Sequence, residues 1–243
     1  MHYDRIRRKR DELRGVWDSL SPEALESFER SFDVAYTHNS TAIEGNTLTL
    51  VQTKAILEDG LSVGGKTLRE IYEVANHGRA FQFVKEHVSQ GEALTESLAK
   101  DIHMQLMNNI LPGGIYRNVE VRISGAGFLP PVGEDMLAQV KAFFAQLAEP
   151  AACNPLERAA WTHAEFVRIH PFVDGNGRTA RMLMNYVLML AGFLPVSVAK
   201  ENRLAYYDAL EAYGAQGELG PFADMVAELE EARLDEYLSL ARA

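Results

Sequence analysis

Apolar and polar positions alternate with a helical period along most of the chain. One apolar face recurs every three or four residues and ends at a histidine, through Leu156, Ala160, His163, Val167 and His170. Proline cannot continue a helix internally, so Pro171 places His170 at the end of this helix. A second apolar stripe follows Arg178. We therefore expect two helices that flank a short loop.

Capping residues and breakers divide the rest of the chain into further helices. Threonines at helix starts, or prolines just inside them, mark most of the beginnings. The predicted helices cover about 50–59, 68–89, 96–110, 134–148, 155–170, 203–213 and 221–240. No internal repeat or low-complexity linker interrupts them, so we predict a single domain over 1–243.

Residues 113–131 break the helical pattern. Between positions 119 and 123, three β-branched apolar residues alternate with two charged ones, and two glycines follow. This pattern predicts a β-hairpin. The expected fold class is therefore mainly α with one short β-hairpin.

Composition and charge exclude several classes of protein. The chain has 243 residues, of which 47% are hydrophobic, and this is enough for a sizeable core. The net charge of −10 argues against a nucleic-acid partner, and we interpret the basic cluster at 5–10 as a solvated face. Cys153 is the only cysteine, and no apolar run approaches a membrane span. We therefore expect a cytoplasmic protein with no membrane partner.

The loop between the two central helices carries the candidate chemistry. It reads His-Pro-Phe-Val-Asp-Gly-Asn-Gly-Arg-Thr-Ala-Arg over residues 170–181. A glycine loop that opens a helix presents unpaired N–H groups to an anion, and Arg178, Arg181 and Asn185 share one face of that helix. Asp174 is a hard oxygen ligand suited to Mg²⁺, and His170 can take a proton from a hydroxyl. The residues indicate attack of an alcohol on phosphorus.

This stretch resembles the core motif of the Fic (Fido) family at every fixed position. The resemblance implies transfer of AMP from ATP to a Ser, Thr or Tyr hydroxyl of a target protein. It also implies roles for individual residues: His170 as general base, Asp174 as Mg²⁺ ligand, Phe172 as anchor of the loop, Gly175, Asn176, Gly177 and Arg178 around the α- and β-phosphates, and Arg181 at the γ-phosphate. No Cys/His cluster with zinc spacing is present.

A second short motif, Ser-Thr-Ala-Ile-Glu-Gly-Asn over 40–46, changes the meaning of the first. Ser40 and Glu44 lie four residues apart on one helical face, and Gly45 is a natural helix stop. The segment resembles the inhibitory motif of Fic proteins, in which the glutamate pairs with the second arginine of the core motif. The resemblance implies a Glu44–Arg181 pair and an auto-inhibited enzyme. Some relatives also remove AMP from the target.

Two further segments resemble parts of the family. Residues 113–131 resemble the flap, which implies that a target peptide docks along this hairpin. Tyr206 and Tyr207 are candidates to border the adenine, although Gly214 stands where several relatives carry an Asn. We interpret His163 as a structural, hydrogen-bonded histidine.

The resemblance divides the single domain into N-terminal helices over 1–60, with the inhibitory motif at 40–45, and a core over 61–243. Self-modification and a homo-oligomer are further expectations. Two alternatives to AMP transfer stay open at this point. One is a Fic-type kinase or other nucleotide-derived phosphotransferase, and the other is a non-catalytic helical interaction module.

Overall fold

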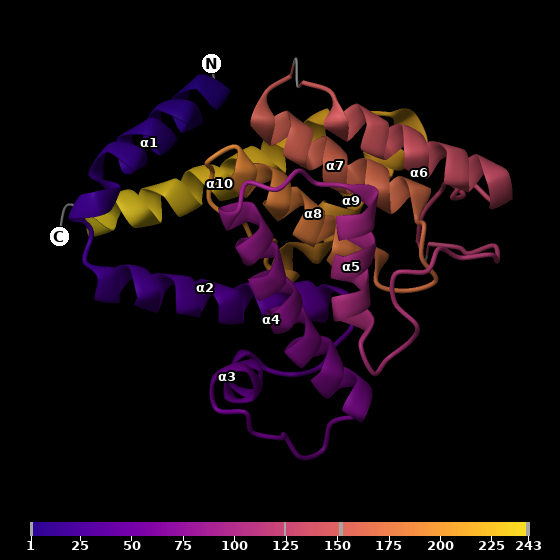
Figure 1. Ribbon diagram of the computed structural model, residues 1–243, viewed down its shortest axis with the longest axis horizontal. Helices are drawn as coiled ribbons and strands as arrows, with labels where there is room; N and C mark the ends of the chain where they lie inside the picture. The colour runs from indigo at the N-terminus through magenta and orange to yellow at the C-terminus, as the bar shows by residue number, and fades with distance from the viewer. Residues whose placement is uncertain (1, 124, 151–152, 242–243) are drawn as a thin grey trace.

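The computed structural model describes residues 2–123, 125–150 and 153–241, and helices make up most of them (Figure 1). The α-helices are α1 (His2–Val16), α2 (Pro22–Ile43), α3 (Leu50–Glu58), α4 (Leu68–Ser89), α5 (Glu96–Met107), α6 (Gly133–Ala148), α7 (Pro155–Ile169), α8 (Asn176–Leu190), α9 (Arg203–Gln216) and α10 (Gly220–Leu240). Short 3₁₀ turns cover Trp17–Ser19 and Lys200–Asn202.

The capping residues act as the sequence predicts. Thr49 and Thr67 each form a capping box with the residue three positions on, and Thr95 and Asn154 accept hydrogen bonds from the first turns of α5 and α7. These side chains satisfy N–H groups that a helix leaves unpaired at its start. The predicted helix starts are thus confirmed, although α5 ends at Met107, three residues early.

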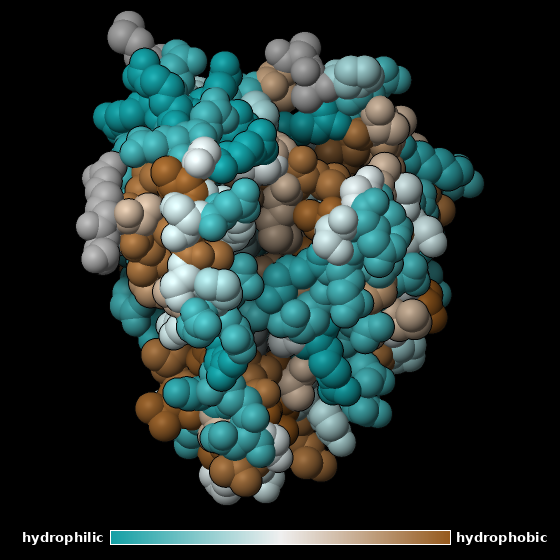
Figure 2. Space-filling view, turned by 60° about the vertical axis from the view of Figure 1, so that its left-hand side comes forward, coloured by the Kyte–Doolittle hydropathy of each residue, from teal (hydrophilic) through white to brown (hydrophobic). Residues whose placement is uncertain are grey.

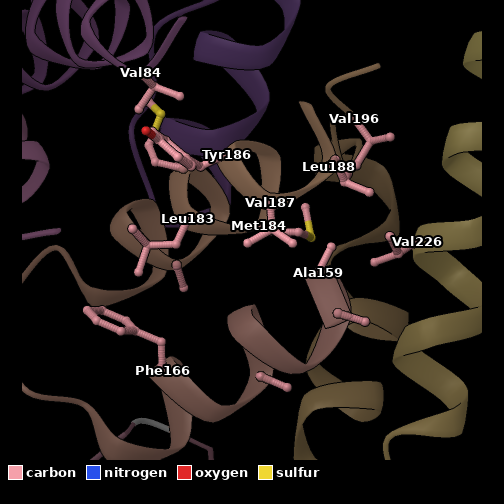
Figure 3. Close-up of a cluster of buried hydrophobic side chains, with 14 of the residues drawn as sticks. Val84, Ala159, Phe166, Leu183, Met184, Tyr186, Val187, Leu188, Val196 and Val226 are labelled. Carbon is pink, nitrogen blue, oxygen red and sulfur yellow. The ribbon is translucent and has the colours of Figure 1, made fainter. Parts of the chain in front are cut away.

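Helices α7 and α8 form the centre of the molecule. Helix α8 is buried almost all round, and its side chains pack against α7, α4, α5 and α2. Figure 3 shows Leu183, Tyr186 and Leu188 of α8 among side chains from neighbouring helices, including Val84 of α4 and Val226 of α10. Because both flanking helices are fixed in the core, the loop between them is held at both ends.

Helix α1 packs along α10 at one side of the molecule (Figure 1). Part of the basic cluster at the start of the chain faces α10, where Arg5 and Lys9 pair with Glu231 and Lys9 also pairs with Asp235. This surface is hydrophilic in Figure 2, whereas hydrophobic residues reach the surface at the lower end, near α3. Leu50, Val51, Leu61 and Leu68 are exposed in that region.

The predicted β-hairpin is wrong. No strand occurs among the described residues of 113–131, which follow an irregular path. The Arg117 side chain occupies carbonyls that a hairpin ladder would use, since it donates to Val119 O (2.8 Å) and to Pro131 O. An isolated two-stranded hairpin is marginally stable in water, so one arginine can replace its ladder.

No helix in the described part of the chain combines the length and the apolar character needed to cross a membrane.

Candidate active site

The end of α7 fixes the orientation of His170. This residue adopts a left-handed conformation (φ 51°), and its backbone N–H still donates to Phe166 O at 3.0 Å. Arg117 Nε donates to the His170 carbonyl (2.8 Å), which holds the turn in place. His170 Nδ1 lies 3.1 Å from Val167 O. A carbonyl can only accept, so Nδ1 carries the hydrogen and Nε2 keeps its lone pair.

Burial lowers the pKa of His170 below its ordinary value, and the nearby Arg117 adds to this effect. The imidazole is therefore neutral at neutral pH, with Nε2 unprotonated. A neutral imidazole with a free lone pair is the form that a general base requires.

Two internal hydrogen bonds and a ring stack on α5 hold the loop after His170. The Asn176 side chain closes it, because Phe172 N donates to Asn176 Oδ1 (2.9 Å) and Asn176 Nδ2 donates back to Phe172 O (2.8 Å). The fully buried Phe172 ring stacks on His103, with ring centres 3.6 Å apart. Phe172 thus lies in the core, where an anchor would lie. Both groups of the Asn176 side-chain amide are hydrogen-bonded within the loop. Only the backbone N–H of Asn176 can therefore face an anion.

His103 is a site residue that sequence reasoning missed. Gly114 N donates to His103 Nδ1 (2.8 Å), so the hydrogen lies on Nε2, which donates to Asp174 O (2.9 Å). Burial lowers the pKa of His103 to about 4, and the ring stays neutral. The available signal was a histidine on the apolar stripe of α5, between Ile102 and Leu106.

Glycines shape the start of α8. Gly175 precedes the helix with a φ of 78°, and an added Cβ would lie 2.9 Å from Met107 Sδ. At Gly177 an added Cβ would lie 2.3 Å from Glu44 Oε1. The positive φ at Gly175 favours glycine, whereas at Gly177 a side chain would have to displace the Glu44 carboxylate, which is the end of a flexible side chain. The N–H groups of residues 176–178 have no partner within the helix and form, with the helix dipole, a site suited to phosphate.

Asp174 lies beside this helix start and accepts from three donors. Its Oδ1 accepts from Gly175 N (2.6 Å) and Arg178 Nη2 (3.1 Å), and its Oδ2 accepts from Arg69 of α4. Burial raises the pKa of Asp174, but the two arginines and the Gly175 amide outweigh burial and the net pKa is lowered. Asp174 is therefore ionised at neutral pH.

The donor set fits Mg²⁺ only in company with a nucleotide. Among the described residues, no group of three or more His, Cys, Asp or Glu side chains could hold a metal ion. Asp174 can supply one carboxylate ligand, and Mg²⁺ commonly binds through one or two carboxylates together with phosphates and water.

Arg181 is fully buried and bonded to the end of α2. Its Nε donates to Ser40 Oγ (2.9 Å), its Nη2 donates to Ser40 O (2.8 Å) and Glu44 Oε1 (2.7 Å), and its Nη1 donates to Tyr206 OH (3.0 Å). Gly45, with a φ of 99°, turns the chain away from α2 after Glu44. Glu44 and Arg181, 137 residues apart, thus bring the two short motifs together at one guanidinium.

The two tyrosines of α9 differ in exposure. Tyr206 is buried between Arg181 and His163, whose Nε2 lies 3.0 Å from the Tyr206 hydroxyl. His163 thus has the partner expected of a structural histidine. Tyr207 is 42% exposed and donates to Ile43 O (3.0 Å) in the last turn of α2. Of the two tyrosines, Tyr207 is the one whose ring a nucleotide base could reach. Contact of either tyrosine with adenine stays a prediction.

The structure separates Asn185 from the loop and brings to it other residues that sequence reasoning missed. Asn185 does not face the anion site, because its amide bonds both to Val196 N and to Val196 O. Glu73 accepts from Arg69 Nε and lies 3.6 Å from Arg178 Nη1. Arg69, Glu73 and Arg117 lie far from the motif in sequence, and only folding brings them to it.

The chain is similar to Fic proteins by three comparisons. The Fic/DOC family model matches residues 93–188, which include His103 and the whole 170–181 loop. A protein adenylyltransferase Fic from Nematostella vectensis is 38% identical over 244 residues, covering 97% of this chain and 55% of the relative. One from Aedes aegypti is 35% identical over 241 residues, covering 97% of this chain and 47% of the relative. The chain thus spans about half the length of these curated relatives.

Comparison with solved structures also finds Fic proteins. Fic-1 (aa134 - 508) from C. elegans superposes with a TM-score of 0.84 at 34% identity, over 98% of this chain and 71% of that one. A Fic domain containing signaling protein from Bacteroides thetaiotaomicron gives a TM-score of 0.87 at 27% identity, over 100% and 98% of the two chains. By sequence motif, site geometry and fold, the chain is a member of the Fic/DOC family.

Proposed function

We propose that this protein transfers AMP from ATP to a hydroxyl group of a target protein. The observation that carries the proposal is a neutral His170 with a free Nε2 lone pair, in the same loop as a helix start whose first N–H groups have no partner within the helix. The names of the Nematostella and Aedes relatives, protein adenylyltransferase, favour AMP as the transferred group.

The proposed reaction assigns one task to each part of the loop. His170 Nε2 takes the hydroxyl proton while the hydroxyl oxygen forms a bond to the α-phosphorus, and the bond to the bridging oxygen breaks so that pyrophosphate leaves. The N–H groups at the start of α8, together with Arg178, stabilise the charge on the phosphate oxygens. Asp174 would hold Mg²⁺, which neutralises phosphate charge when bound.

We further propose that the enzyme is inhibited by its own Glu44. A γ-phosphate that binds Arg181 would have to displace the carboxylate that now lies 2.7 Å from its Nη2. The wild-type protein would then bind ATP in a non-reactive pose. The same carboxylate could orient a water molecule for removal of AMP, which is the second activity we propose to test.

The target protein would dock along residues 113–131. The proposal rests on the exposed side chains of Ile115, Val119 and Leu129, and on the path of this segment beside His170, where Arg117 N donates to Pro171 O at 2.9 Å. An irregular segment offers fewer main-chain partners than a hairpin edge, so side-chain contacts would carry more of the recognition.

Labelled ATP separates the proposed transferase from its alternatives. With Mg²⁺, the Glu44→Gly protein should transfer label from α-labelled ATP, and not from γ-labelled ATP, to itself or to proteins in a lysate. Transfer from γ-labelled ATP alone would show a kinase, and no transfer from either would leave a non-catalytic module. Glu44→Gly combined with His170→Ala should lose at least ~100-fold in rate, as expected for removal of a positioned base.

A further inference from the structure

Arg69 is a third arginine at the active-site loop, and it comes from another helix. It is the second residue of α4, and its Nη2 donates to Asp174 Oδ2. Its Nε donates to Glu73 Oε1 (3.1 Å), one turn further along α4. The guanidinium therefore bridges two carboxylates and presents a different nitrogen to each.

This contact leaves neither oxygen of Asp174 free. Oδ1 accepts from Gly175 N (2.6 Å) and from Arg178 Nη2 (3.1 Å), and both donors belong to the loop and to α8. Oδ2 accepts from Arg69. A divalent cation binds directly to a carboxylate oxygen, at a distance that leaves no room for a guanidinium on the same lone pair. Arg69 therefore occupies one of the two lone pairs of Oδ2 and places its positive charge beside the other, where a metal would bind.

Arg69 can leave this position at little cost to the fold. Its side chain is 53% exposed, whereas the side chain of Arg178 is 2% exposed. Glu73 keeps a second partner when Arg69 leaves, because Asn46 Nδ2 donates to its Oε2 at 2.9 Å. Partly exposed ion pairs contribute little to stability. Of the three donors to Asp174, Arg69 is the one that can move into solvent.

We propose that Arg69 and a divalent cation compete for Asp174 Oδ2, so that Arg69 restrains the metal-dependent step of nucleotide binding. This inference rests on the proposed function, which makes Asp174 the metal ligand. Arg69 is a positioning residue here, since it acts through Asp174. Its restraint differs from that of Glu44, which opposes the γ-phosphate at Arg181.

The test measures ADP binding by isothermal titration calorimetry, with Mg²⁺ or with EDTA. ADP lacks the γ-phosphate, so the Glu44–Arg181 pair does not oppose it. Arg69→Met keeps the apolar stem and removes the guanidinium. The matched control is Arg30→Met, because Arg30 is also half-exposed (58%) and pairs with a glutamate four residues away.

We expect Arg69→Met to tighten ADP binding in Mg²⁺ by about twofold to fivefold, the range for loss of a partly exposed ion pair. Binding in EDTA should change less than twofold, and Arg30→Met should change neither value. Adding Asp174→Asn to Arg69→Met should abolish the gain. This comparison of Mg²⁺ with EDTA separates competition for the metal ligand from a structural effect, which would alter both values.

Two results would overturn the proposal. Equal ADP affinity in wild type and Arg69→Met with Mg²⁺ would show that the guanidinium does not compete with the metal. Weaker binding of Arg69→Met in EDTA would show that Arg69 contacts phosphate directly. Either result leaves the proposed AMP transfer intact, because label transfer by Glu44→Gly tests that function separately. If no variant binds ADP under either condition, both proposals fail.

Discussion

Replacing Glu44 with glutamine should weaken the fold and tighten ATP binding at the same time. The change keeps the shape of the side chain and removes the charge that pairs with Arg181 at 2.7 Å. A hydrogen bond to a charged group is worth about 1.5–3 kcal/mol, and the Glu44 side chain is 34% exposed, so we take about 1.5–2 kcal/mol. Arg181 keeps its bonds to Ser40 and Tyr206 and therefore stays in place.

The same free energy appears in two measurements. Released from Glu44, Arg181 should bind the γ-phosphate of ATP with a dissociation constant about 10- to 30-fold lower, because each 1.4 kcal/mol is a factor of ten. Urea unfolding of the nucleotide-free variant should show a loss of about 1.5–2 kcal/mol, since Arg181 is left buried with neutral partners only.

Calorimetry with ATP and Mg²⁺ on His170→Ala proteins avoids turnover during the measurement. Glu58→Gln serves as the control, because Glu58 ends α3, pairs with Lys54 at 3.7 Å and lies outside the site. An unchanged ATP affinity in Glu44→Gln, with unchanged stability, would refute the pair as an inhibitory contact. Lower stability without tighter ATP binding would show a structural pair that does not compete with phosphate.

Three further predictions concern buried titratable groups. His103→Phe keeps the stack on Phe172 and loses both hydrogen bonds of the imidazole, so it should cost about 1–3 kcal/mol in urea unfolding and slow AMP transfer by Glu44→Gly. Burial lowers the pKa of His170, so the acid limb of the rate profile should lie below pH 6.5, and a midpoint above 7 would contradict the assignment. Burial also raises the pKa of Glu230 well above its ordinary value. The folded protein then keeps a proton that the unfolded chain releases, so stability should fall as pH rises from about 4.5 through the folded-state pKa. Glu230→Gln should flatten this fall between pH 5 and 8 and keep an acceptor for Leu194 N.

The elements that the sequence predicted well are those determined by local chemistry. The starts of α3 and α4 follow from Thr49 and Thr67, whose side chains cap the backbone three residues on. The end of α7 follows from Pro171. Each rule needs only neighbours in sequence, which explains why these boundaries could be predicted.

The hairpin prediction failed because the segment is held by contacts with residues far away in the sequence. Alternation over 119–123 is compatible with a strand, but the Val119 carbonyl accepts from the Arg117 side chain, which also donates to the His170 carbonyl. Phe128, in the same segment, packs on Gly214 of α9, where an added Cβ would lie 2.0 Å from its ring. No local pattern reveals a segment held by contacts with α7 and α9.

The candidate site also has a part that the sequence predicts and a part that it does not. The loop motif could be read from sequence because twelve consecutive residues hold its base, carboxylate, glycines and arginines. Its supports could not, since His103 and Arg117 act on the loop through backbone carbonyls, which accept from any donor. Backbone partners leave no complementary residue type in the sequence, so such contacts are visible only in the fold.

Without a nucleotide, the charged groups of the site are paired with groups of the same chain, and these pairs explain how the site could be inhibited. Arg181 is paired with Glu44, and Asp174 is paired with Arg69. A nucleotide with its metal would replace both partners, the γ-phosphate at the arginine and the cation at the carboxylate. Because each ligand charge displaces an existing charge, binding gains only the difference between two similar interactions. Removal of the Glu44 charge should therefore favour binding of the γ-phosphate, and removal of Arg69 should favour binding of the metal. The double variant Glu44→Gln with Arg69→Met should tighten binding of Mg·ATP by about the product of the two single effects.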